Sequence, residues 1–256
     1  MTNTATQEQP RRHWWRWILG AIVLVLVISA AGFVAWAYGV SSMPAAQDAL
    51  VSDDTVTVNT ENWISFVPSE PPDTGLIFYP GGRVPAEAYA PLARRIAEQG
   101  YLVVITYAPL RLAIINPNAA DPVIEHFSGI DTWAIAGHSL GGATAAIYVS
   151  SHPDVVDGII FLASYPPDDS LASRDNLAVL SIHASEDGLA TVAEVGAFAS
   201  ELPENTQYDL IEGGNHAQFG YYGEQAGDGV ATISREEQQS QTEAAIVEFL
   251  GTLGGS

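Results

Sequence analysis

The stretch TWAIAGHSLGGATAAIYVSS, residues 132–151, decides the fold of this chain. It opens with the apolar run TWAIA, which is typical of a buried strand, and continues into a run that favours a helix. Between the two, residues 137–141 match the pattern G-x-S-x-G, which holds a serine in a strained strand–turn–helix elbow with its hydroxyl exposed. A glycine-rich turn with an incidental serine is the competing interpretation. The strand before the motif and the helix after it make Ser139 a candidate nucleophile.

Strand and helix signals alternate on both sides of this elbow. Short apolar runs predict eight strands, at 55–59, 63–67, 75–79, 101–107, 132–136, 158–163, 177–183 and 208–211, the first two as a hairpin. Helices are expected at 85–98, 121–127, 140–151 and 191–200, and a last helix follows the S-x-x-E capping box of Ser234 and Glu237. Near-continuous apolar runs are typical of parallel strands buried on both faces. The sequence therefore predicts an α/β fold with a mostly parallel sheet.

A serine hydroxyl needs a base to remove its proton, and in the elbow architecture the acid and the base follow the serine along the chain. An acid is expected after a later strand, where LAVLSIHASEDGLA, residues 177–190, offers Glu186 and Asp187. We favour Asp187, while Glu186 stays open because a shift of one residue redirects the side chain. The base is expected after the last strand, and His216 in GGNHAQFG has that position. His138, by contrast, is the variable residue of the elbow.

An acyl-transfer site also needs two backbone N–H donors for the developing oxyanion. We expect the first from Leu140, which follows the serine at a helix N-terminus. The second is expected from FYPGGRV, residues 78–84, where we assign Gly82 and keep the N–H of Arg83 as the alternative. For the Arg83 side chain we favour a surface salt bridge, and the orientation of an anionic substrate group stays the alternative.

Composition narrows the possible partners and chemistry. The chain has 256 residues, with nine basic residues, all arginine, against thirty acidic ones, for a net charge of -21. Nucleic-acid binding needs a basic surface, so we exclude nucleic acid as a partner. There is no cysteine, which excludes disulfides, thiolate metal sites and a cysteine nucleophile.

The N-terminal segment carries a separate signal. Residues 18–38, ILGAIVLVLVISAAGFVAWAY, contain no charge, and a helix of this length spans the roughly 30 Å of a bilayer core. Arg11, Arg12 and Arg16 precede it, together with three tryptophans at the boundary, as the positive-inside rule and an interfacial aromatic belt require. The alternative is a cleaved signal peptide and a secreted protein, because Ala35-Trp36-Ala37 resembles a cleavage site.

These signals divide the chain into four parts. We expect a cytoplasmic basic N-terminus at 1–16, an uncleaved transmembrane signal anchor at 17–38, a linker at 39–54 and an extracytoplasmic domain at 55–256. The membrane is thus an expected partner through the N-terminal helix.

The motifs YPGGRV, GHSLGG, SEDG and GGNHAQFG, in this order, resemble those of the α/β-hydrolase superfamily over about residues 63–253. The chain looks most like its compact, capless branch of carboxylesterase- and dienelactone-hydrolase-like proteins. The resemblance implies an eight-stranded, mainly parallel sheet flanked by helices, a Ser139–His216–Asp187 triad, and neither metal nor organic cofactor. Residues 164–176 are too few for an inserted lid. We therefore expect a shallow site, unless the segment 217–233, with Phe219, Tyr221 and Tyr222, folds over it.

The resulting hypothesis is a carboxylesterase-like serine hydrolase that cleaves an ester or related acyl bond of a small-molecule or lipid-like substrate. A peptidase, thioesterase or acyltransferase with the same triad is the nearest alternative. A non-catalytic binding module of the cell envelope on the same fold is the alternative outside enzymes.

Overall fold

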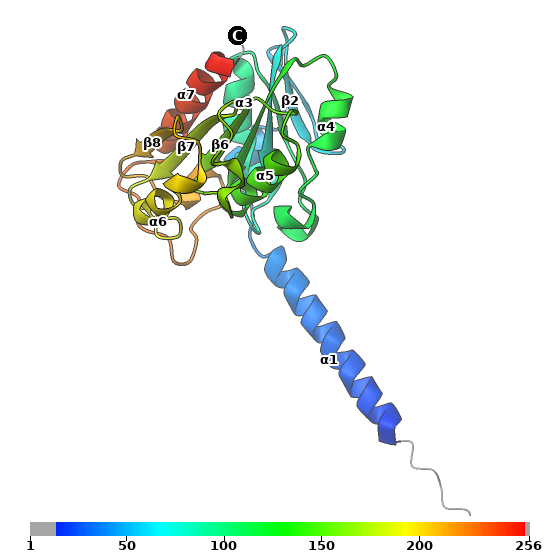
Figure 1. Ribbon diagram of the computed structural model, residues 1–256. Helices are drawn as coiled ribbons and strands as arrows, with labels where there is room; N and C mark the ends of the chain where they lie inside the picture. Colours follow the sequence, from blue (N-terminus) through cyan, green and yellow to red (C-terminus); the bar gives the residue numbers. More distant parts are fainter. Residues whose placement is uncertain (1–13, 254–256) are drawn as a thin grey trace, which may run out of the picture. The chain divides into compact units, whose positions relative to one another are not determined.

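The computed structural model describes residues 14–253, and the chain divides into two compact units, Met1–Ala37 and Tyr38–Ser256 (Figure 1). The described part of the first unit is one helix, α1 (Trp14–Ala37), which starts four residues before the uncharged run. Its mean hydropathy reaches 2.8, so α1 is long and apolar enough to cross a membrane. Arg11 and Arg12, which belong to the expected basic N-terminus, lie outside the described residues.

The second unit is built around one eight-stranded sheet, and each of the eight predicted runs forms a strand. The strands are β1 (Val56–Asn59), β2 (Ile64–Pro68), β3 (Thr74–Tyr79), β4 (Leu102–Ile105), β5 (Thr132–His138), β6 (Gly158–Leu162), β7 (Ala178–Ala184) and β8 (Gln207–Ile211). Their order is β1-β2-β4-β3-β5-β6-β7-β8; β1 and β2 are antiparallel, as are β2 and β4, and the other pairs are parallel.

This order determines where a site can form. After β3 the chain adds β4 on one side and then returns to add β5 on the other. The loops that leave β3 and β5 therefore diverge and open a crevice at the carboxyl end of the sheet, which is where ligands bind in open α/β sheets. The GHSLGG motif follows β5 and the YPGGRV motif follows β3, so both lie at this crevice.

Helices cover both faces of the sheet (Figure 1). The longer helices are α3 (Ala90–Glu98), α5 (Leu140–Ser151) and α7 (Arg235–Leu253), and the short ones are α2 (Pro44–Asp48), α4 (Asp121–His126) and α6 (Val192–Ala197). Single 3₁₀ turns are η1 (Ala86–Tyr89), η2 (Pro109–Arg111), η3 (Ala113–Ile115), η4 (Asp169–Leu171), η5 (Ala199–Glu201) and η6 (Ala217–Phe219). The predicted helix at 85–98 is thus divided into η1 and α3.

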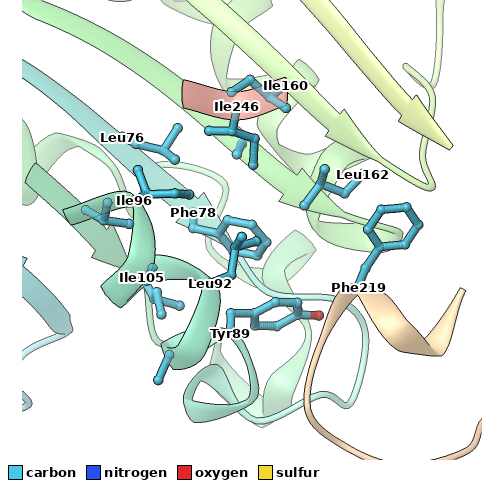
Figure 2. Packing of buried hydrophobic residues seen from close by; sticks show 14 of the residues in the cluster. Leu76, Phe78, Tyr89, Leu92, Ile96, Ile105, Ile160, Leu162, Phe219 and Ile246 are labelled. Atoms are coloured by element: carbon cyan, nitrogen blue, oxygen red, sulfur yellow. The ribbon is translucent and has the colours of Figure 1, made fainter. Parts of the chain in front are cut away.

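Two apolar cores lie on the two faces. Because side chains alternate along a strand, Leu76 and Phe78 of β3 face α3 and α7, whereas Ile77 and Tyr79 face α4 and α5. Figure 2 shows the first core, where Leu92 and Ile96 of α3 and Ile246 of α7 pack against strand residues. Burial on both faces explains the near-continuous apolar runs of the strands.

The segment that we expected to be a linker, 39–54, differs from that expectation. It contains the helix α2 and packs onto the domain, with Ala46 and Ala49 buried. Arg94 of α3 donates from Nε to the Ala49 carbonyl at 2.9 Å and pairs with Asp53 at 2.7 Å. A helix of five residues is too short to be stable alone, and the packing that stabilises it comes from residues distant in the chain.

Candidate active site

Ser139 lies in the elbow between β5 and α5 with φ 51° and ψ -123°, a backbone conformation that is strained for a residue with a side chain. The flanking glycines make this turn possible. A Cβ at Gly137 would overlap the backbone of Gly141, and one at Gly141 would overlap the backbone of Tyr79. The G-x-S-x-G pattern is therefore required by backbone packed against backbone, and it presents Ser139 at the carboxyl end of the sheet.

Asp187 and His216 form a buried pair at the same end of the sheet. Asp187 follows β7 and His216 follows β8, and the Asp187 Oδ2 to His216 Nδ1 distance is 2.8 Å. Their side chains are 0% and 1% exposed. Asp187 Oδ1 also accepts hydrogen bonds from the N–H groups of Leu189 and Ala190, both at 2.7 Å. Glu186, the alternative acid, is exposed and bonds to Ser185 instead.

The pairing with Asp187 determines how the His216 ring is protonated. An ionised carboxylate only accepts hydrogen bonds, so Nδ1 carries the proton and the neutral ring has its lone pair on Nε2. Nε2 is buried and has no hydrogen-bond partner among the described residues. It is therefore available to take a proton from a hydroxyl that approaches it, which is the property that a general base needs.

Gly82, one of the two candidate oxyanion donors, lies against the side chain of the other, Leu140. A Cβ at Gly82 would come within 3.3 Å of the Leu140 side chain. The alternative donor, the Arg83 N–H, donates to the Arg111 carbonyl at 2.7 Å, and the Gly81 N–H donates to the Tyr89 hydroxyl at 2.9 Å. Within residues 14–253 the N–H groups of Gly82 and Leu140 have no acceptor, which leaves them for an oxyanion.

His138 takes a position that sequence reasoning missed. Its ring is fully buried, with its centroid 4.5 Å from that of His216, and its Nδ1 is 2.8 Å from the Tyr89 hydroxyl. Burial and the neighbouring charge of His216 together hold the pKa of His138 well below its ordinary value. A histidine at the variable position of the elbow gives no local signal for this contact, because Tyr89 and His216 come from distant parts of the chain.

The profile of the alpha/beta hydrolase family matches residues 75–240. The chain belongs to this family. Solved structures of the same fold include TT1662 from Thermus thermophilus, with TM-score 0.59, 17% identity and coverage of 76% of this chain and 98% of that chain. A predicted CIB-like hydrolase from Thermoplasma acidophilum has TM-score 0.55, 16% identity and coverage of 75% and 99%. Est1E from Butyrivibrio proteoclasticus has TM-score 0.55, 12% identity and coverage of 77% and 99%. A search of curated proteins found no match.

A small pocket in this α/β hydrolase opens beside Ser139. Its volume is about 260 Å³, and none of its lining side chains is charged. The lining residues are Ser139, Leu140, Ala143, Ala163, Ser164, Tyr165, Leu189 and Ala190. A larger pocket of about 380 Å³ lies next to Trp63 and Tyr107, and it shares no residue with the first. Of these two pockets, the one at Ser139 joins the elbow to the loop that carries Asp187.

The aromatic side chains of the segment 217–233 pack into the domain next to the elbow, with the ring centroids of Phe219 and Tyr222 5.8 Å and 6.3 Å from that of His138. Phe219, Tyr221 and Tyr222 are buried, and Phe219 and Tyr222 belong to the core cluster on the α3 and α7 face. The connection 164–176 holds only the single turn η4, so no lid domain follows β6. Within residues 14–253 no group of three or more His, Asp or Glu side chains is arranged to hold a metal ion.

Proposed function

We propose that this α/β hydrolase is a serine esterase that cleaves a carboxylic ester or a related acyl bond. The observation that carries the proposal is the buried Asp187–His216 pair at the same end of the sheet as an elbow serine, with a free lone pair on His216 Nε2. In this proposal Ser139 is the nucleophile, His216 the general base and Asp187 the carboxylate that orients it.

The reaction follows from these assignments. Ser139 Oγ attacks the acyl carbon while its proton moves to His216 Nε2, and Asp187 stabilises the resulting imidazolium through Nδ1. The N–H groups of Leu140 and Gly82 hold the oxyanion. His216 then protonates the leaving alcohol, and an acyl group stays on Ser139. Water attacks this acyl-enzyme with His216 again as base, which releases the acid and restores the serine.

The pocket beside Ser139 supports a substrate with a short, uncharged acyl group. Its volume of about 260 Å³ is below the range of roughly 300–1,000 Å³ that is usual for drug-sized ligands. Alanines form three of its walls, at Ala143, Ala163 and Ala190. The net charge of -21 disfavours the approach of anionic substrates.

A fluorophosphonate probe tests the proposal, because it reacts with a serine only when a base and an oxyanion site activate it. We expect labelling of the full chain in detergent, a labelled peptide that maps to Ser139, and no labelling of Ser139→Ala. A folded wild-type chain that does not react would overturn the assignment. p-Nitrophenyl esters of increasing acyl length, run beside a thioester and an anilide, then identify the preferred acyl bond.

A further inference from the structure

Asp228 lies in the segment between η6 and α7 and is the acceptor for N–H groups of two separate loops. Its Oδ2 accepts from Ala217 N at 2.8 Å, and its Oδ1 is 3.2 Å from His216 N. The same Oδ1 is 3.3 Å from Gly188 N and also accepts from Gly229 N at 2.8 Å. One carboxylate therefore joins the loop that carries His216 to the turn that carries Asp187.

The backbone around Asp228 packs tightly against the acid turn. A Cβ at Gly229 would overlap the Glu186 carbonyl, and a Cβ at Gly188 would lie 2.5 Å from the Gly227 carbonyl. Asn215, the residue before His216, donates from Nδ2 to the Gly229 carbonyl at 2.8 Å. The segment 227–229 thus lies between the two loops and contacts both.

We propose that Asp228 is a positioning residue of the active site, which holds the Asp187 turn and the His216 loop in the alignment that proton transfer needs. The inference rests on the proposed serine esterase function. Hydrogen bonds from N–H groups to an ionised carboxylate are roughly twice as strong as those between neutral groups. One of these donors is the N–H of His216 itself, so a shift of Asp228 moves the His216 backbone and with it the imidazole.

The position of the imidazole matters far more for catalysis than for folding. A misplacement of about 1 Å can cost about 100-fold in rate, even where the fold is retained. Substrate binding in the pocket beside Ser139 uses none of the groups that Asp228 contacts. Loss of Asp228 should therefore lower kcat and leave KM unchanged.

Asp228→Asn in the full chain tests this. The amide keeps the shape of the side chain but has one acceptor oxygen, so its NH₂ faces either the Ala217 N–H or the N–H groups that Oδ1 accepts from in the wild type. With p-nitrophenyl acetate we expect kcat to fall about 10- to 100-fold, with KM within about twofold of wild type. Asp228→Ser is a second, smaller variant with the same expectation. Glu212→Gln, an exposed acid four residues before His216, is the matched control and should keep wild-type kcat.

The results separate the two proposals. Wild-type chain that fails to react with the fluorophosphonate overturns the esterase function and this inference together. Wild-type chain that reacts at Ser139, with both Asp228 variants at wild-type kcat, overturns only the role of Asp228. A fall in kcat with a matching rise in KM also overturns it, since a general loosening of the site would move both.

Discussion

At the scale of single residues, His138 and His216 show how two adjacent imidazoles take different roles. Their ring centroids are 4.5 Å apart, so a proton on one disfavours a proton on the other. His216 has the Asp187 carboxylate to stabilise its charge, whereas His138 faces the Tyr89 hydroxyl. Burial keeps His138 neutral through its lowered pKa. In the proposed mechanism, the proton taken from Ser139 therefore belongs on His216.

The neutral state of His138 predicts a pH-dependent stability. Its folded pKa lies below the ordinary value of 6.5, so below pH 6.5 the unfolded chain binds a proton that the folded chain does not. Stability should fall as the pH drops through this range, by at most about 1.4 kcal/mol per pH unit for one such group. Urea unfolding at pH 7 and pH 5 should show a smaller loss for His138→Gln than for wild type.

His126→Gln is the control for this experiment, because His126 is an exposed histidine at the end of α4. It should keep the wild-type dependence on pH. Equal losses in wild type and His138→Gln between the two pH values would show that His138 does not resist protonation in the folded chain.

Single residues also show how much of the candidate site could be predicted from the sequence. Chain order and local pattern were enough to select Ser139 and His216 as candidates. They could not separate Asp187 from Glu186, because adjacent residues of a turn differ only in direction, and only Asp187 points to His216. Neither could they show that the Arg83 N–H is occupied, since its acceptor, Arg111, lies 28 positions further along the chain.

At the scale of elements, α5 provides one wall of the pocket at Ser139. The fourth residue of this helix is Ala143, whose small side chain leaves the space open. Ala143→Leu should fill part of that space. We expect the ratio of kcat/KM for p-nitrophenyl butyrate to that for the acetate to fall at least about tenfold, since one methylene in an apolar pocket is worth about 10- to 200-fold.

Ser150→Leu places the same side chain on an exposed position of the same helix, so it should leave the ratio at its wild-type value. If Ala143→Leu also leaves the ratio unchanged, the acyl group does not bind in this pocket.

Helices and strands could be predicted from the sequence where their burial requires a regular pattern of apolar residues. All eight strands followed from apolar runs, and α5 has the predicted bounds. The short helix α2 was not predicted, since Ala49 at its C-terminal end is held by Arg94 and by the core rather than by the local sequence. Strand order was not predicted either, because it depends on pairing between runs that are distant along the chain.

At the scale of the whole molecule, α1 is an exposed apolar helix that needs an apolar environment, whereas the acidic domain needs water. Every described side chain of α1 before Ala37 is exposed, and the helix has no charged residue after Arg16. We propose that α1 is an uncleaved membrane anchor with the acidic domain outside the cytoplasm. The alternative of a cleaved signal peptide differs from it in a measurable way, since cleavage near Ala37 would release the domain.

Fractionation of cells that produce the full chain tests the anchor. We expect the protein in the membrane fraction after a carbonate wash, with an intact N-terminus by mass. The double substitution Leu24→Asp and Leu26→Asp should release or mislocalise it, because each charge at the centre of a membrane helix costs about 2.5–3.5 kcal/mol. Ser42→Asp, outside the helix, is the control and should stay bound. A chain that starts near Tyr38 and is found in the medium would contradict the anchor.

The backbone contacts of the elbow also have a consequence for protein engineering. At Gly137 and Gly141 the atoms that a new Cβ would meet belong to the main chain. Every residue has the same main-chain atoms, so a second substitution elsewhere cannot remove this overlap. Libraries that aim to change which acyl group is accepted should hold these two positions constant. Their diversity belongs at Ala143, Tyr165 and Leu189, which line the pocket beside Ser139.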